Sequence, residues 1–408
     1  MDKAIIIRFC EIHLKGKNRR FFENLLKENI EKSLSGIEHE TIDLHSRYLV
    51  KNFDSFDYDE IVSRLKKVAG IHSFSLADVV ENDPDKIIGK ALGICEGRTG
   101  TFKVETNRAE KSFPYKSVEF SALVGGKILE KFSENLKVNV KNPDFTVHID
   151  IREDGETFVF TDYVAGMGGM PVGSSGKGLL LISGGIDSPV AGYMTAKRGM
   201  KIDALHFESF PYTGEAAKEK VIKLSKMVAA YNGGNMNLYV CRFTEIQEAI
   251  HKNCPEEFMI TLMRRFMMRI AERLAKKIHD QAIITGENLG QVASQTIESI
   301  TSSNSVVTLP VLRPLIMFDK LEIIAVSEKI GTYETSILPY EDCCTVFLPK
   351  FPSIKPNLDR VIKAESALDV EPLIENAIKN LELIKLEDVF NMKRYRLSDI
   401  SFLRLDFS

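Results

Sequence analysis

The residues best suited to chemistry lie between Gly178 and Pro189, where the sequence reads GLLLISGGIDSP. The apolar run 179–182 is typical of a buried parallel strand, and it breaks into a Ser-Gly-Gly turn that has no bulky side chain to keep an anion away from the backbone. Ser188 and Pro189 predict the N-cap and first residue of a helix that stops at Gly199. A strand, a glycine turn and a helix N-terminus together present backbone N–H groups to an anion. We therefore predict a pyrophosphate-binding loop at this turn.

The predicted loop also carries side chains that suit a magnesium nucleotide. The hydroxyls of Ser183 and Ser188 add hydrogen-bond donors, and Asp187 offers an oxygen ligand that can hold Mg²⁺ against phosphates. A Ser-Gly-Gly turn alone is more often a flexible connection, so the interpretation depends on the strand before it and the Asp-Ser-Pro after it. We expect ATP with Mg²⁺ at this loop. No metal site built from protein ligands alone is predicted, because no two of the six cysteines have the CxxC spacing.

Three later segments could complete a nucleotide site. A strand over 202–207 ends in His206 and Phe207, beside the end of the first strand if the sheet is doubly wound, although these two residues could equally be a buried strand-end pair. A helix over 256–277 carries arginines off its apolar stripe, and its methionines are better explained as core. A second strand and glycine turn, ending at Gly286, is expected to lead into another helix. In that helix Gln291 and Gln295 would share one face.

Two basic segments are candidates for RNA contact. Residues 13–20 carry cations and no acid between a strand over 4–9 and a helix over 21–35, and a solvated surface explains them equally well. Residues 107–116 mix cations with Phe113 and Tyr115, which suits RNA backbone and unstacked ends, unless the aromatic rings pack inward. The candidate RNA-binding residues are Lys15, Lys17, Arg19, Arg108, Lys111 and Lys116.

The elements that must position these residues fall into several domains, because 408 residues are too many for one ordinary core. The β–α–β order of residues 1–75 predicts a ferredoxin-like α+β domain, and 76–165 predicts a second domain. Residues 166–178 hold six glycines and predict a Gly-rich linker. Strands and helices of 179–408 predict an α/β fold with a doubly wound parallel sheet.

Composition limits the class of protein. The chain is 44% hydrophobic and 27% charged, and no apolar run approaches the ~20 residues that span a membrane. We expect a cytoplasmic protein with no membrane segment and with reduced thiols. A net charge of -3 means that RNA binding would depend on local patches. Adjacent Cys343 and Cys344 are incidental thiols, a strained redox pair, or a nucleophile that carries sulfur as a persulfide.

These motifs resemble known families. The string Ser183 to Gly192 resembles the PP-loop of the N-type ATP pyrophosphatases, which are adenine-nucleotide alpha-hydrolase-like enzymes. From about residue 4 to 355 the chain is similar to the tRNA 4-thiouridine synthetases, or tRNA sulfurtransferases. Matches to their THUMP domain are Phe102-Lys-Val, Thr106-Asn-Arg108, Lys111-Ser-Phe-Pro and Val140-Lys-Asn-Pro-Asp. Other matching motifs are Leu14-Lys-Gly-Lys-Asn-Arg19, His206-Phe207, Ser209-Phe-Pro-Tyr-Thr213, Met263-Arg-Arg, Thr285-Gly-Glu, Gly290-Gln-Val-Ala-Ser-Gln-Thr296, Arg313-Pro-Leu and Glu341-Asp-Cys-Cys344.

The resemblance implies an enzyme that activates the uridine at position 8 of tRNA. ATP adenylates the C4 oxygen, and a cysteine persulfide then displaces AMP. The implied catalytic residues are Asp187 and Cys344. The implied ATP contacts are Leu181, Ile182, Ser183, Gly184, Gly185, Asp187, Ser188, His206, Phe207, Arg264, Gly286 and Gln295.

Some features depart from the family pattern or stay open. Many members carry a C-terminal rhodanese domain and this sequence shows none, so a cysteine desulfurase or another donor is expected to supply sulfur. Glu208 stands where histidine is common and would change polarity near the adenine, and Cys10 stands where glycine is usual and is expected to be structural. A homodimer and a role in thiamine thiazole synthesis stay open. The rival interpretations are a PP-loop ligase or amidotransferase acting on a small molecule, and a non-catalytic RNA-binding module.

Overall fold

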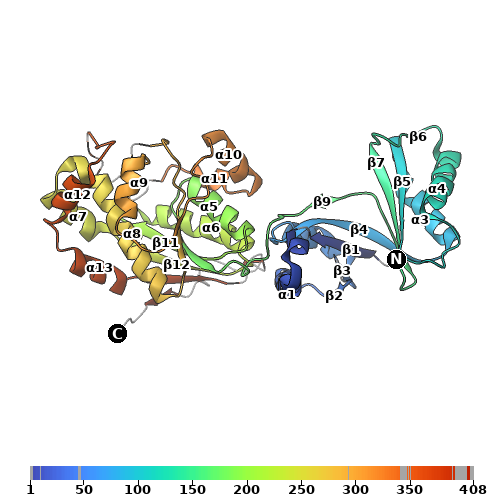
Figure 1. Ribbon diagram of the computed structural model, residues 1–408, viewed down its shortest axis with the longest axis horizontal. Helices are drawn as coiled ribbons and strands as arrows, with labels where there is room; N and C mark the ends of the chain where they lie inside the picture. Colours follow the sequence, from blue (N-terminus) through green and yellow to red (C-terminus); the bar gives the residue numbers. More distant parts are fainter. Residues whose placement is uncertain are drawn as a thin grey trace. The chain divides into compact units, whose positions relative to one another are not determined.

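The chain divides into two units in the computed structural model, Met1–Gly169 and Met170–Ser408 (Figure 1). The structure describes residues 3–9, 11–44, 47–292, 294–340, 347, 349, 351–387, 389–390 and 402–404.

The first half of unit one is an antiparallel sheet with helices on one face. β1 pairs with β3 on one side and β4 on the other. Ile5 and Ile7 of β1 are fully buried against α1 and α2, and Ala4 and Ile6 on its other face are also fully buried, in a second cluster with Phe158, so this strand is covered on both faces. The elements are β1 (Lys3–Phe9), the 3₁₀ helix η1 (Glu11–Asn18), α1 (Arg19–Ser33), β2 (Glu40–Asp43), β3 (Arg47–Lys51), η2 (Ser55–Asp57), α2 (Tyr58–Leu65) and β4 (Ile71–Glu81).

The second half of unit one continues the same sheet. The far end of β4 pairs with β8, so one nine-stranded sheet has the order β2-β3-β1-β4-β8-β7-β5-β6, with β9 also on β4. The predicted boundary between 75 and 76 therefore falls inside a strand that both halves share. The elements are α3 (Pro84–Cys95), β5 (Gly100–Arg108), α4 (Ser117–Phe132), β6 (Leu136–Val138), β7 (Phe145–Ile151), β8 (Glu156–Phe160) and β9 (Val164–Ala165).

The glycine-rich segment 166–178 is bonded to structured backbone at both of its ends. The Gly168 N–H donates to the Ile71 carbonyl at 2.7 Å, and the Gly173 N–H donates to the Gly199 carbonyl at 2.8 Å. Met167 and Met170 are buried. Each end of the segment is therefore bonded within its own unit, and the role of residues 166–178 as the linker between the two units stays a prediction.

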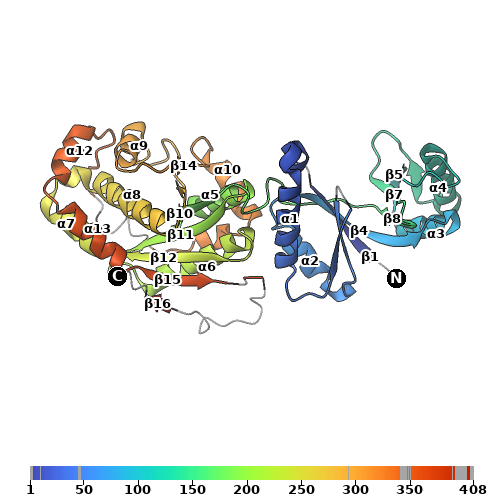
Figure 2. The same cartoon turned by 60° about the horizontal axis from the view of Figure 1, so that its bottom comes forward.

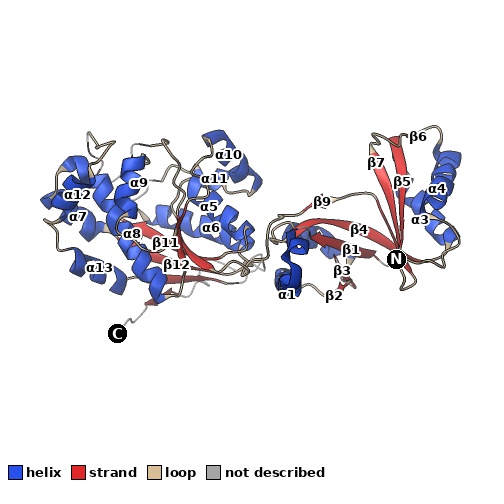
Figure 3. Ribbon diagram, viewed as in Figure 1, coloured by secondary structure: helices blue, strands red, loops and turns tan. Residues whose placement is uncertain are grey.

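Unit two is a sheet with helices on both faces (Figures 2 and 3). The strand order is β14-β13-β10-β11-β12-β15-β16, and the first five strands are parallel. α5 and α6 pack together on one side, and α8 packs with α7, α9, α12 and α13 on the other. The predicted doubly wound fold is confirmed, with two antiparallel strands added at one edge.

The elements of unit two begin with β10 (Lys177–Leu181), α5 (Asp187–Lys197), β11 (Lys201–Glu208), α6 (Glu215–Tyr231), β12 (Met236–Arg242), α7 (Thr244–Asn253), η3 (Glu256–Phe258), α8 (Met259–Lys277) and β13 (Ala282–Ile284). They continue with α9 (Ile297–Asn304), β14 (Val311–Leu312), α10 (Lys320–Lys329), α11 (Tyr333–Ser336), α12 (Leu358–Glu365), α13 (Val370–Lys379), β15 (Glu382–Leu386) and β16 (Phe402–Arg404). Within the described part of the chain, no helix has the length and apolar character that crossing a membrane requires.

Candidate active site

The loop between β10 and α5 is closed by its two serines. The Ser183 N–H donates to Ser188 Oγ at 2.9 Å, and the Gly185 N–H donates to Ser183 Oγ at 3.2 Å. α5 begins at Asp187 with Ile186 as its N-cap, so the prediction of Ser188 as the N-cap is wrong. The Ser188 hydroxyl lies in the first turn of the helix and bonds back to the loop instead. The loop and the helix N-terminus together form an anion-binding geometry.

A cavity lies where β10, β11 and β13 end, and these are neighbouring parallel strands. Ligands of open α/β sheets bind at this edge of the sheet. Of the predicted ATP contacts, Gly184 does not line the cavity. The predicted contacts that line it are Leu181, Ile182, Ser183, Gly185, Asp187, Ser188, His206, Phe207, Arg264, Gly286 and Gln295.

Gly286 brings the turn after β13 against the start of α5. A Cβ at this position would lie 2.8 Å from the Ser188 backbone nitrogen and 3.0 Å from the Asp187 carbonyl carbon. Contacts that short with backbone atoms force something to shift, so a side chain here would push the two turns apart. The second strand–glycine junction of the sequence is thus part of the same site as the first.

The predicted helix carrying Gln291 and Gln295 is absent from the described residues of this loop. The Gly290 N–H bonds to the Gln295 carbonyl at 2.8 Å and closes a turn, and α9 starts later, with Thr296 as N-cap. Gln295 lines the cavity, while Gln291 reaches Asp187. The two side chains therefore do not share the face of a helix.

Asp187 has two side-chain partners. Lys320 Nζ lies 2.7 Å from its Oδ1, and Gln291 Nε2 donates to its Oδ2 at 2.9 Å. Sequence reasoning missed Lys320, which is 133 positions from Asp187. One signal was present, because Lys320 directly follows the helix cap Asp319, where the helix dipole disfavours a cation. A lysine at a position that the helix dipole disfavours indicates a role outside the helix, which here is the pair with Asp187.

Glu287 forms the wall of the cavity beside Arg264. Its carboxylate is 4% exposed and pairs with Arg264 and with Arg313, the latter at 2.6 Å, and Thr285 Oγ1 donates to it at 3.0 Å. Burial alone would raise the pKa of Glu287, but the two guanidinium groups more than offset it and hold that pKa below its ordinary value. A buried anion thus fixes Arg264 at the cavity.

The rest of the cavity wall is largely apolar. Phe207 lines it and packs edge-on against Phe243, with ring centroids 5.2 Å apart, and His206 Nδ1 lies 3.1 Å from the Ile182 carbonyl. Met267 and Met268 also line it, so these two methionines of α8 are more than the core residues that the sequence interpretation made them. A flat, largely apolar ring such as a nucleobase would fit this part of the cavity.

Glu208 lies away from the cavity lining, contrary to the expectation that it changes polarity near the adenine. Its buried carboxylate pairs with Arg242 at 3.5 Å and Lys218 at 3.6 Å.

The candidate nucleophile Cys344 lies outside the described residues, as do Cys343 and Cys10. Among the described thiols, Cys95 and Cys241 are buried and Cys254 is partly buried. Burial raises the pKa of each of these thiols, that of Cys95 to about 11. Thiolate chemistry is therefore disfavoured at all described cysteines.

Unit one presents the predicted RNA-binding cations in two ways. Lys15, Lys17, Lys111 and Lys116 are exposed. Arg19 pairs with Glu23 at 2.7 Å, and the Arg108 guanidinium donates to the carbonyls of Phe113 and Tyr115 at 3.2 Å, which closes the 109–116 loop. Phe113 is 5% exposed and packs against Phe120, so its predicted RNA contact is wrong: the ring completes the core.

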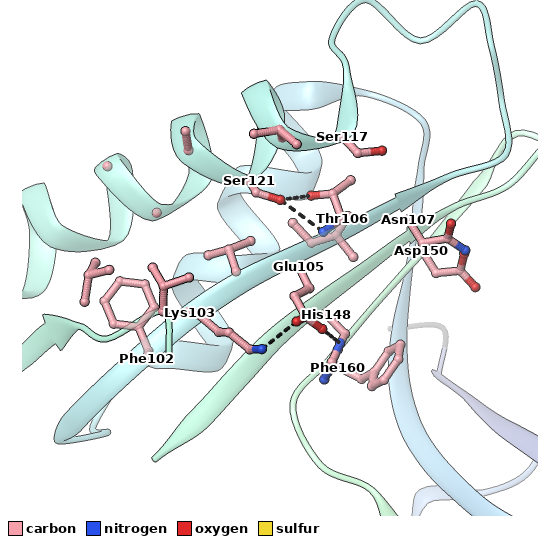
Figure 4. A pocket seen from close by; sticks show the side chains of 18 of the residues that line it. Phe102, Lys103, Glu105, Thr106, Asn107, Ser117, Ser121, His148, Asp150 and Phe160 are labelled. Carbon is pink, nitrogen blue, oxygen red and sulfur yellow. Dashed lines mark hydrogen bonds and ion pairs between the residues drawn. The ribbon is translucent and has the colours of Figure 1, made fainter. Parts of the chain in front are cut away.

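A second cavity lies in unit one between α4 and the sheet (Figure 4). Ser121 of α4 faces Thr106 of β5, and Glu105 lies between Lys103, at 2.5 Å, and His148, at 3.5 Å. The cavity also holds Arg8 over the Phe160 and Tyr163 rings, and Arg47 paired with Asp150 at 2.5 Å. Sequence analysis did not anticipate this cavity. Cations beside aromatic faces suit an unstacked nucleic-acid end.

The chain is similar to known proteins along most of its length. Residues 173–370 match the family described as Thiamine biosynthesis protein (ThiI), 4–75 match the ThiI ferredoxin-like domain, and 81–162 match the THUMP domain. A probable tRNA sulfurtransferase of Alkaliphilus oremlandii is 48% identical over 95% of this chain and 99% of its own. One of Acetivibrio thermocellus is 47% identical over the same shares. A solved 4-thiouridine synthetase–RNA complex with bound ATP is 38% identical, with a TM-score of 0.87 over 95% of this chain and 100% of that one.

Proposed function

This chain belongs to the tRNA sulfurtransferase (ThiI) family, and we propose that it uses ATP to convert the uridine at position 8 of tRNA to 4-thiouridine. The observation that carries the proposal is the phosphate loop, followed by Asp187 paired with Lys320, at the ends of three parallel strands in a chain that matches a tRNA sulfurtransferase over 95% of its length. The tRNA substrate places the reaction in the cytoplasm.

The nucleotide is bound with its base inside the cavity and its phosphates at the loop. Phe207, Met267 and Met268 offer apolar surface to the adenine. The backbone N–H groups of the loop and the N-terminus of α5 bind phosphate oxygens, and Arg264, fixed by Glu287, adds a charged donor. The α-phosphorus then lies near Asp187, where the nucleobase must arrive.

The residues at the loop fit a magnesium ion held jointly with phosphates. Asp187 offers a carboxylate and the two serines offer hydroxyl oxygens, and the described residues contain no cluster of three or more acidic, histidine or cysteine ligands. Mg²⁺ commonly uses one or two carboxylates together with substrate phosphates. Bound there, it would neutralise charge on the leaving pyrophosphate. Lys320 would then be released from Asp187 to contact phosphate.

Adenylation and sulfur transfer follow as two displacements. The C4 oxygen of the uridine attacks the α-phosphorus and pyrophosphate leaves with its electron pair. The terminal sulfur of a persulfide on Cys344 attacks C4, and AMP leaves with the former C4 oxygen. A second thiol then cleaves the remaining S–S bond, which releases 4-thiouridine and leaves a disulfide.

Phe347 is a described residue three positions after Cys344 in the sequence. Phe347 packs against Tyr212 and His251, with ring centroids 5.1 and 5.4 Å apart. Tyr212 belongs to the segment that follows the cavity residue Phe207 along the chain. A cysteine desulfurase is the proposed sulfur source, and the same persulfide could serve thiamine thiazole synthesis.

Unit one is the proposed tRNA-binding part. Its exposed lysines bind phosphate groups, and its cavity between α4 and the sheet accepts an unstacked end of the RNA. A homodimer stays a prediction, which a measurement of the oligomeric state tests.

The test is 4-thiouridine formation on unmodified tRNA with ATP, Mg²⁺ and a cysteine desulfurase plus cysteine. Mass spectrometry of the digested tRNA should find 4-thiouridine at position 8, and a tRNA with cytidine at that position should yield no thiolated base there. Cleavage of ATP to AMP with a small-molecule acceptor and no tRNA would instead favour a PP-loop ligase or amidotransferase.

A further inference from the structure

Four large apolar side chains are exposed in the two segments whose residues Gln291 and Lys320 bond Asp187. Leu289 is 39% exposed, Val292 50%, Met317 79% and Leu321 76%. We call these four residues the apolar lip. They come from two segments, the loop 286–296 and the stretch that leads into α10.

The lip is tied to the catalytic carboxylate on both sides. Val292 directly follows Gln291, and Leu321 directly follows Lys320, and these are the two residues that bond Asp187. Consecutive Cα atoms are about 3.8 Å apart, so the Cα atoms of Val292 and Leu321 each lie that close to the Cα atom of a residue that bonds Asp187.

The two segments of the lip are also fixed to each other. The Leu289 N–H donates to the Ile316 carbonyl at 3.2 Å, which sets Leu289 beside Met317. The buried Asn288 side chain donates to the carbonyls of Leu315, at 3.2 Å, and Phe318. The lip is therefore a surface held by backbone and side-chain bonds, rather than four unrelated exposed residues.

We propose that the apolar lip holds the target uracil ring against ATP. This inference rests on the proposed function and names the part of the site that receives the base. The interior of the cavity is lined by Leu181, Phe207 and the α8 methionines, so the acceptor must approach from the Asp187 side. Its C4 oxygen has to reach the α-phosphorus there.

A nucleobase fits the lip better than a protein does. A base taken out of its stack needs apolar or aromatic surface on its faces, and enzymes that act on bases supply such surface beside the reacting groups. The lip is small, and charged groups follow it directly, with Lys320 beside Leu321 and Glu322 after it. Contact of a sulfur-donating protein with the lip is the alternative that the test must separate.

The experiment compares the double variants Met317→Ser/Leu321→Ser and Leu289→Ser/Val292→Ser with the wild type. Ile362→Ser is the matched control, because Ile362 is 48% exposed and belongs to α12, away from the lip. AMP formation is measured in a single turnover with saturating ATP and unmodified tRNA and without any sulfur donor. ATP and tRNA affinities are measured separately.

We expect each double variant to form AMP about 10- to 100-fold more slowly, because it removes two of the four apolar side chains that would cover the extruded base. ATP and tRNA affinities should stay within about twofold, because phosphate contacts dominate the binding of both. Ile362→Ser should match the wild type in all three measurements.

Wild-type AMP formation in the double variants would overturn the inference, and if thiolation were lost in them the lip would serve the sulfur donor instead. A loss of tRNA affinity with an unchanged saturating rate would also overturn it, because the lip would then be a general RNA contact. Failure of the wild type itself to form AMP with tRNA would remove the proposed function, and this inference with it.

Discussion

Replacing Glu287 with glutamine should weaken ATP binding and lower the stability of unit two. The side chain keeps its size but loses the charge that holds Arg264 and Arg313. Two partly exposed guanidinium groups would then face a buried neutral amide with no carboxylate between them. Arg264 lines the cavity, so the change should affect nucleotide binding as well as stability.

The magnitude follows from the burial of the pair. Removing one partner of a buried ion pair costs about 3–5 kcal/mol, because the other charge is left uncompensated. For a unit of this size each kcal/mol lowers the melting temperature by about 2–4 °C, so Glu287→Gln should melt roughly 6–20 °C below the wild type. With Arg264 released, ATP should bind about 10- to 100-fold more weakly, which corresponds to about 1.4–2.8 kcal/mol.

Glu365 provides a matched control in the same unit. It is buried and is also held by two arginines of α8, Arg265 at 2.8 Å and Arg269 at 2.6 Å, but it does not line the cavity. Glu365→Gln should lose a similar amount of stability and retain ATP affinity in the folded protein. Thermal melting and titration with ATP at a temperature where both variants are folded separate the two effects. Equal ATP affinity in the two variants would refute the role given to Glu287.

The same carboxylates predict a dependence of stability on pH. Burial opposes ionisation of Glu365, but hydrogen bonds and charge from Arg269 and Arg265 lower its pKa to about 2, and the pKa of Glu287 is also below its ordinary value. A pKa lower in the folded state stabilises the fold above the ordinary carboxyl pKa and loses that contribution as pH falls through the folded value. Each glutamine variant should therefore lose less stability than the wild type between neutral pH and pH about 2.

Four further predictions concern the reaction and the RNA. Asp187→Asn should slow tRNA-dependent AMP formation about 100- to 1,000-fold, as removal of a group that organises charge at a reacting centre does, and a change below tenfold would count against its role. Lys320→Met should slow the same step by a similar factor while leaving the melting temperature nearly unchanged, because the pair with Asp187 is partly exposed. Cys344→Ser should form AMP with tRNA but no 4-thiouridine, and undiminished thiolation would exclude Cys344 as the sulfur carrier. Lys111→Ala should weaken tRNA binding and reduce the slope of log affinity against log salt by about 1, whereas an unchanged slope would place this lysine off the RNA.

The parts of the site that are contiguous in sequence could be predicted, because a strand, a glycine turn and a Ser-Pro helix start each have a recognisable pattern within a few residues. The phosphate loop, His206 and Gly286 are of this kind. The contacts of Lys320, Arg313 and Glu287 could not be predicted in this way, although the position of Lys320 after the helix cap Asp319 was one signal of another role. Lys320 meets Asp187, and Arg264 and Arg313 meet Glu287, through the pairing of β10 with β13 and of β13 with β14, which only the folded chain sets.

The errors have specific physical causes. The helix expected at Gln291 does not form because Gly290, with a φ of +76°, turns the backbone and bonds to the Gln295 carbonyl. Ser188 does not cap α5 because its hydroxyl closes the phosphate loop. Phe113 was expected to contact RNA, but the core between α4 and the sheet takes its ring. In the first two cases a hydrogen bond within the loop replaced the expected helix or cap, and in the third a core contact took the side chain.

The central claim is that the cavity at the phosphate loop transfers the α-phosphorus of ATP to the C4 oxygen of the target uridine. Its most direct test uses tRNA labelled with ¹⁸O at that oxygen, a complete reaction with sulfur donor, and mass spectrometry of the AMP produced. The account predicts one ¹⁸O atom in the AMP for each 4-thiouridine formed. AMP free of ¹⁸O beside fully thiolated tRNA would contradict it.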